Sequence, residues 1–167
     1  QRQMCIRDSK KEYPQFFPKQ FADSVWVSRI QDTLQQQLDA EVAKQFPDNS
    51  EIEDQLTPLF QHIQYYFPEF TPPTIFTVTS DVDYNNKVIA TDTMLVVALD
   101  TYLGSDHRFY EGIQKYISKD LKPVQIAPDV ASVYARQLIS KPQKRDLLAQ
   151  MIFFGKELYL KDLWLPN

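Results

Sequence analysis

The most distinctive polar segment follows the third apolar run of the chain and could provide acid/base chemistry. Its candidate site residues are Asp100, Asp106, His107 and Glu111. Carboxylates and an imidazole at the end of a strand could line a catalytic or ligand pocket. The alternative is structural, with Asp106 capping a short helix through His107–Glu111. We favour the structural interpretation because no nucleophile or second histidine accompanies this segment.

The two histidines of the chain, His62 and His107, are too far apart for a metalloprotease motif. That chemistry needs two histidines four residues apart on a helix, with a glutamate between them. The segment Asp129–Leu138, predicted to be the helix after the strands, contains no histidine. The order of elements is similar to that of zincin-like proteases, but an analogy of fold assigns no activity. We predict no catalytic residue and no metal site.

A second polar pattern, Asp81–Asn85 with Asp92 further on, alternates oxygen ligands in the manner of a calcium loop. However, Asn86 stands where such a loop needs glycine, and predicted strands rather than helices flank the pattern. The simpler interpretation is a hairpin turn whose Asp and Asn side chains satisfy turn amides. Calcium binding is the weaker alternative, and we predict no cofactor.

The elements that must position these residues begin with helices. Apolar residues from Val25 to Phe46 recur at steps of three and four, which predicts one amphipathic helix. The segment Ser50–Glu53 then predicts a capping box at the start of a second helix. This helix continues to Phe67, and we expect Pro58 to kink or interrupt it.

Three short strands are predicted in the middle of the chain. Thr74–Thr79 alternates apolar residues with threonine, which is typical of a half-buried strand. Lys87–Thr91 is a second strand, and Met94–Leu99 is a third that we expect to be buried on both faces. Asn85 and Asn86 can adopt the positive φ of a tight hairpin, so we expect a three-strand meander.

Two helices follow the strands. Pro128 suits the first turn of a helix that continues to Leu138. The last helix runs from about Arg145 to Leu163 and is apolar nearly all round, so it is either central and buried or awaits a missing partner. Helices, a small three-stranded sheet and further helices together predict an α+β fold.

Composition narrows the class of protein without naming a function. The chain has 167 residues with 43% hydrophobic residues, which suits one folded domain. Its formal net charge of −4 argues against a nucleic-acid partner. The sequence contains no run of eighteen apolar residues and no signal peptide.

Five blocks of sequence, in this order, resemble the gliding-motility lipoprotein GldB family. The blocks are Thr33–Asp48, Phe60–Phe70, Thr79–Tyr84, Leu99–Gly112 and Leu148–Leu163. The resemblance extends over most of Tyr13–Asn167 and depends on the ordered series rather than on any short motif. It implies an envelope lipoprotein of gliding bacteria, anchored by an acylated cysteine and associated with the gliding and protein-secretion apparatus. The family is not known for an enzymatic activity.

We expect residues 1–9 (QRQMCIRDS) to be a non-native extension, since they resemble read-through of a sequencing adapter. Cys5 would then have no functional role. Residues 10–167 would form a single GldB-like domain that is incomplete at its C-terminus and lacks the lipid anchor of its parent. We expect this fragment to be soluble, while its parent is membrane-anchored in the cell envelope.

The leading hypothesis is a non-enzymatic envelope domain that acts through contacts with other gliding and secretion proteins. The alternative is a degenerate or incomplete zincin-like hydrolase whose catalytic residues lie outside this chain. In that case Asp100–Glu111 would supply one wall of the pocket.

Overall fold

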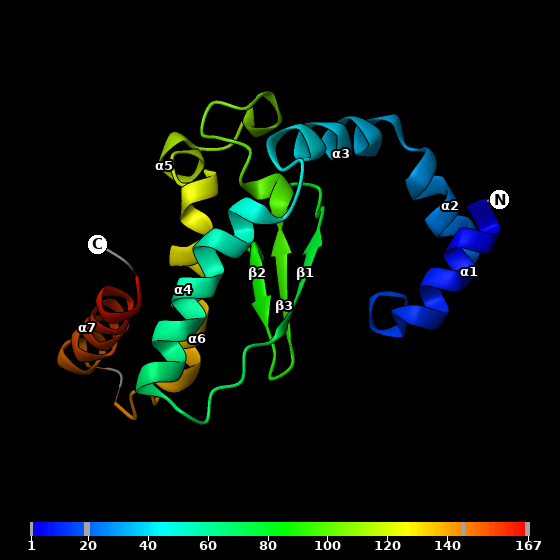
Figure 1. Ribbon diagram of the computed structural model, residues 1–167. Helices are drawn as coiled ribbons and strands as arrows, with labels where there is room; N and C mark the ends of the chain where they lie inside the picture. The colour runs from blue at the N-terminus through cyan, green and yellow to red at the C-terminus, as the bar shows by residue number, and fades with distance from the viewer. Residues whose placement is uncertain (1, 19–20, 145, 166–167) are drawn as a thin grey trace.

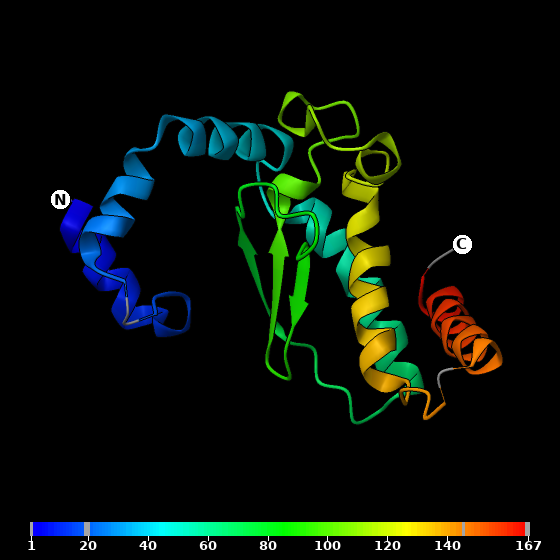
Figure 2. The same ribbon diagram turned by 180° about the vertical axis from the view of Figure 1, so that it is seen from behind.

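The computed structural model describes residues 2–18, 21–144 and 146–165. A three-stranded sheet is covered on one face by α4 (Ser50–Tyr66) and α6 (Ile126–Leu138), and α7 (Leu147–Trp164) packs outside these two helices (Figure 1). Figure 2 shows α6 between the sheet and α7. The N-terminal helices form an arm on the opposite side of the sheet (Figure 1). The predicted α+β class is confirmed.

The N-terminal arm contains α1 (Arg2–Glu12), a 3₁₀ turn at Pro14–Phe16, α2 (Asp23–Gln31) and α3 (Thr33–Gln45). The prediction of one helix from Val25 to Phe46 is therefore wrong, because Asp32 adopts an extended conformation between two helices. Its carboxylate accepts hydrogen bonds from the first amides of α3, which compensates for the broken helix. The α1 helix includes residues 2–9, whose non-native origin stays a prediction.

Helix α4 begins differently from the predicted capping box. Ser50 is the first helical residue, and its amide and hydroxyl donate to the Asp48 carboxylate at 2.9 and 2.5 Å. The predicted interruption at Pro58 is also wrong, since α4 continues through it. Its buried apolar face supports the helix despite the missing amide donor. That face consists of Ile52, Leu56, Leu59, Phe60 and Ile63.

The three predicted strands exist, but they do not form a meander. The strands are β1 (Thr74–Val78), β2 (Val88–Ala90) and β3 (Met94–Ala98), in the spatial order β1-β3-β2. The central strand β3 runs parallel to β1 and antiparallel to β2. The most apolar strand thus occupies the position where both of its edges are hydrogen-bonded. The segment between β1 and β2 therefore crosses one end of the sheet instead of making a tight hairpin.

Only one face of the central strand is fully buried, contrary to our expectation for both. Leu95 and Val97 point into the core with 0% exposure, whereas Met94 and Val96 are half-buried. On the sheet's other side, rings from the N-terminal arm contact the Phe76 ring of β1, with centroids 6.0 and 5.1 Å away. The arm therefore covers this face in part.

Short helical turns connect the sheet to α6. They are Leu99–Thr101, Arg108–Tyr110, α5 (Lys115–Ser118) and Pro123–Gln125. A small apolar cluster of Leu38, Leu103, Tyr110 and Leu121 joins α3 to this region. The larger core lies between the sheet, α4 and α6, and the fully buried Trp164 joins it from α7.

Helix α7 resolves the choice that its composition left open. One side packs against α6 and α4, while seven large apolar side chains on the other sides are at least half exposed. The alternative of a central, fully buried helix is therefore wrong. None of the helices in the described part of the chain is long and apolar enough to cross a bilayer.

Candidate functional site

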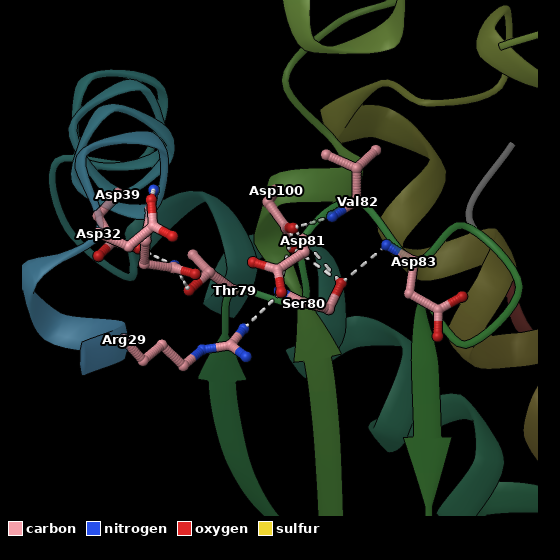
Figure 3. Close-up of polar contacts among 10 residues, drawn as sticks. Arg29, Asp32, Asp39, Thr79, Ser80, Asp81, Val82, Asp83 and Asp100 are labelled. Carbon is pink, nitrogen blue, oxygen red and sulfur yellow. Dashed lines mark hydrogen bonds and ion pairs between the residues drawn. The ribbon is translucent and has the colours of Figure 1, made fainter. Parts of the chain in front are cut away.

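Asp100, immediately after β3, is fully buried and organises the loop after β1. Its carboxylate accepts hydrogen bonds from the Ser80 amide at 3.0 Å, the Val82 amide at 2.6 Å and the Ser80 hydroxyl at 3.2 Å (Figure 3). The Ser80 hydroxyl in turn accepts from the Asp83 amide at 3.2 Å. These donors compensate the buried carboxylate for its lost hydration.

The loop held by Asp100 has an unusual backbone. Asp81 and Val82 both have left-handed conformations, with φ of 58° and 60°. Aspartate tolerates this region, but a β-branched valine is strained there. The positive φ expected at Asn85 or Asn86 therefore occurs four residues earlier, where the Asp100 carboxylate binds the loop amides. Strain of this kind persists only where the surrounding contacts require it, and it often accompanies function.

This strained loop forms one wall of a groove on the surface of the described part of the chain. The Arg29 guanidinium of α2 donates to the Asp81 carboxylate at 2.8 Å across the groove (Figure 3). The groove has a volume of about 750 Å³ and lies between α2, α3 and the loop. Its apolar lining comes from Val25, Leu34, Leu38, Val82 and Phe109.

Helix α3 is tied to the same end of the sheet by a glutamine. The Gln35 side-chain amide donates to the Thr79 hydroxyl at 2.8 Å and to the Asp39 carboxylate at 2.9 Å. Asp32, which caps α3, also lines the groove. The groove therefore combines an apolar lining with a charged rim, an arrangement that suits a bound peptide or protein segment.

The four polar residues singled out in the sequence do not share one hydrogen-bond network among the described residues. Asp100 faces the loop after β1, as described above. His107 lies against α3, with Nε2 3.6 Å from a Glu41 carboxylate oxygen. Asp106 is exposed and accepts a hydrogen bond from the Ser105 hydroxyl at 3.2 Å, and Glu111 is exposed.

The predicted helix cap at Asp106 is one residue too early. His107 precedes the 3₁₀ turn Arg108–Tyr110, and its Nδ1 accepts from the Phe109 amide at 3.4 Å. The imidazole also stacks on the Phe109 ring, with centroids 5.5 Å apart. The His107 imidazole therefore caps this turn in place of the Asp106 carboxylate. The role of these four residues as a pocket stays a prediction.

Tyr110 locks this segment from within. Its hydroxyl donates to the Asp100 carbonyl at 2.8 Å and accepts from the Leu103 amide at 2.9 Å. Burial raises the pKa of Tyr110 well above its ordinary value, so the hydroxyl keeps its proton. The backbone of Asp100 and that of Leu103 are both hydrogen-bonded to the buried Tyr110 side chain. This pairing makes the segment from Asp100 to Leu103 a rigid support for the loop beside the groove.

The calcium pattern has a different use in the structure. The Asp83 carboxylate accepts from the Asn85 amide at 3.1 Å and from the Asn86 side chain at 2.8 Å. The Asn86 hydrogen bond lowers the pKa of Asp83, outweighing a small opposing effect of burial. Asp81 pairs with Arg29 instead. The turn interpretation is confirmed for Asp83, and no group of His, Cys, Asp and Glu within the described residues is arranged to hold a metal ion.

A second polar cluster, which the sequence did not reveal, joins β2 to α6. The Asp129 carboxylate accepts from the Lys87 ammonium and from the Tyr102 hydroxyl, the latter at 2.9 Å. Burial and then the Asp129 charge raise the pKa of Tyr102 far above its ordinary value. The cluster is a structural tie between elements that are far apart in sequence, and no local motif signals it.

Arg29 and Leu34 were also missed as groove residues. Both residues lie within the stretch from Val25 to Phe46, which the sequence pattern predicted to be a single helix. Their side chains face the loop only because the chain turns at Asp32. A signal was available in Asp32 itself, since Asp is a preferred N-cap residue.

The fold and the groove define an α+β domain with a mixed sheet and an apolar groove with a charged rim. Comparison with protein families gives a specific result: the model of the family described as gliding motility protein GldB matches residues 1–167. The chain belongs to the GldB family of gliding motility lipoproteins. No curated protein and no solved structure matches it significantly.

Proposed function

We propose that this chain is a non-enzymatic domain of the cell envelope that supports gliding motility, and the associated secretion apparatus, through protein–protein contacts. Membership of a family of gliding motility lipoproteins supports the proposed place of the domain in the cell envelope and its role in gliding. In the parent protein, a lipid anchor would hold the domain at the membrane. Its partners would be other envelope proteins of the gliding and secretion apparatus.

The observation that carries this proposal is the groove between α2, α3 and the Asp100-bound loop. An apolar lining with a polar rim is typical of surfaces that bind another protein. Leu34 offers an anchor for such a contact, because it lines the groove and is 61% exposed. The Arg29–Asp81 ion pair at the rim is exposed on both sides, so a partner can exchange it for its own charges at little cost.

The rigidity of one groove wall is consistent with recognition. The buried Asp100 carboxylate fixes the loop in its strained conformation before any partner arrives. A preorganised wall lowers the ordering entropy that binding must overcome.

Gliding of cells that express groove variants from the native gene tests the proposal. Leu34→Asp places a charge on the apolar lining and should abolish or strongly reduce gliding while leaving protein abundance unchanged. Tyr116→Asp is the matched control, because Tyr116 is 66% exposed and lies outside the groove. We expect the control to glide normally.

The chain with a photo-crosslinking residue at position 34 should form a cross-link to one envelope protein of the gliding or secretion apparatus in living cells. The additional substitution Arg29→Glu should reduce the yield of that cross-link. Normal gliding of both Leu34→Asp and Arg29→Glu cells would contradict a role of the groove. Measuring secretion in the same strains separates the two parts of the proposal, since a motility defect with intact secretion would remove the secretion role.

A further inference from the structure

The outward side of α7 carries seven of the eighteen exposed large apolar side chains in the described part of the chain. Its exposed side chains are Leu147, Leu148, Met151, Ile152, Phe154, Leu158 and Tyr159, each between 50% and 77% exposed. Seven such side chains present on the order of 700 Å². Soluble monomers rarely expose so large a contiguous patch, and a stable interface buries about 800 Å² on each partner.

Gly155 lies in the middle of this surface. With 3.6 residues per turn, it falls nearly opposite the side of α7 that carries Phe153, Glu157 and Trp164 toward the core. Apart from its chain neighbours and the backbone of α7 itself, a Cβ at this position would meet no atom of the described residues within 4 Å. A glycine inside a helix costs stability relative to alanine, and among the residues that the structure describes nothing occupies the space that a side chain at 155 would fill. It does allow another backbone to approach closely.

The apolar surface is symmetric about this glycine along the helix. Met151 and Ile152 lie four and three residues before Gly155, and Leu158 and Tyr159 lie three and four residues after it. An antiparallel copy of α7, related by a two-fold axis at Gly155, would therefore place apolar side chains on apolar side chains. Self-complementarity of this kind is what a two-fold symmetric interface requires.

The charges at the ends of the surface favour the same arrangement. Asp162 is exposed and lies seven residues after Gly155, on the same side of the helix. In an antiparallel pair it would lie beside the first turn of the partner's α7, where free amides and the helix dipole favour a negative charge. Docking of this surface into a bilayer would instead bury the carboxylate in apolar surroundings.

We propose that α7 is a self-association surface, through which two copies of this chain pair antiparallel about Gly155. This interface is separate from the groove, since α7 lies on the other side of the sheet from α2 and α3 (Figure 1), the helices that line the groove. Loss of one therefore leaves the other intact. The two proposals fail independently.

Sedimentation equilibrium of the full 167-residue chain tests the association. We expect a dimer at micromolar concentration. The Leu158→Glu variant should dimerise at least 100-fold more weakly, because each copy would bury one charged carboxylate against apolar side chains of its partner. Val124→Glu is the matched control, because both positions are 65% exposed. A monomer at all concentrations, or equal effects of the two variants, would overturn the proposal. Circular dichroism confirms that both variants fold.

Disulfide trapping in a Cys5→Ser background tests the register. Gly155→Cys should cross-link between copies under mild oxidation, whereas the neighbouring Lys156→Cys, about 100° further round the helix, should not. Because a side chain at 155 could itself hinder the approach, a mixture of Met151→Cys and Tyr159→Cys chains should also give a mixed disulfide. Cross-linking at 156 as fast as at 155, without the mixed product, would overturn the antiparallel register. Binding of a monomeric chain to phosphatidylcholine vesicles, abolished by Leu158→Glu, would overturn the pairing in favour of a membrane surface.

Discussion

Removal of the Asp100 carboxylate is the most informative perturbation of this fold. The side chain is fully buried and accepts hydrogen bonds from two amides and one hydroxyl of the loop after β1. Asp100→Ala leaves the Ser80 and Val82 amides without their acceptor. It also removes the force that holds Val82 in a strained left-handed conformation.

The magnitude follows from these contacts. Each hydrogen bond to a charged acceptor contributes about 1.5–3 kcal/mol, but the three share one carboxylate and are not additive. Ser80 and Val82 are half-buried, so water reaches their amides in part once the loop relaxes. We therefore expect Asp100→Ala to lower the free energy of unfolding by about 3 kcal/mol.

Asp100→Asn separates the charge from the geometry. Its amide oxygen can take the place of the carboxylate oxygen that binds both loop amides, and its NH₂ group can donate to the Ser80 hydroxyl. The expected loss is about 1 kcal/mol, which is the difference between a charged and a neutral acceptor. Asp81→Asn, which removes only an exposed ion pair with Arg29, should cost less than ~1 kcal/mol.

Urea unfolding at neutral pH measures all three variants, and hydrogen exchange reports the Ser80 and Val82 amides directly. Faster exchange of these two amides in Asp100→Ala, with unchanged exchange in β3, would locate the effect in the loop. A loss below 1 kcal/mol for Asp100→Ala would refute the reasoning. So would an equal loss for Asp100→Ala and Asp100→Asn.

Further variants test three other features of the fold. Asp32→Ala should cost about 1 kcal/mol in urea unfolding because α3 loses its cap, and an equal cost for Asp32→Ser would contradict this. Burial raises the pKa of Tyr134 to about 12, so this hydroxyl makes stability independent of pH below about pH 10, and stability falls as pH rises from 10 toward 12 because only the unfolded chain loses the proton easily. Tyr134→Phe should remove that loss of stability at alkaline pH. It should also raise the free energy of unfolding at pH 7 by about 1 kcal/mol, since the buried hydroxyl has no partner among the described residues. A lower free energy of unfolding at pH 7 would contradict this prediction. Arg136→Met should lower the free energy of unfolding by about 2 kcal/mol, because it leaves the buried Glu157 carboxylate without its ion-pair partner. Glu157→Met should be nearly neutral, since the Arg136 side chain is 59% exposed and water can solvate it. If thermal unfolding showed a larger loss for Glu157→Met than for Arg136→Met, this account would be excluded.

Local sequence patterns predicted most of the elements but not their connections. The bounds of β1 and β3 agree with the expected strands to one residue, because alternation is a property of a few consecutive side chains. The meander was wrong because strand order depends on which edges meet in space. The single helix from Val25 was wrong for a related reason: its apolar spacing continues across Asp32, where the backbone turns.

The candidate site was predictable only in part. Asp100 was singled out as the residue that ends the buried strand, and the structure gives it three donors from a loop eighteen to twenty residues earlier. The groove beside it was missed, because Arg29 and Asp81 are 52 residues apart and the local pattern around Asp81 indicates a turn or a calcium loop, not an ion pair with a distant helix. A long-range ion pair leaves no periodic signal in the sequence.

The sequence by itself determined the α+β class, the position of each strand and the family, since these depend on short-range patterns and on the order of the blocks. Only the tertiary structure decided the strand order, the left-handed loop at Val82 and the exposed side of α7. The physical reason is the same in each case. Hydrophobic burial has no direction, so an apolar pattern shows that a surface must be covered. Which surface covers it is set by hydrogen bonds and packing between distant segments.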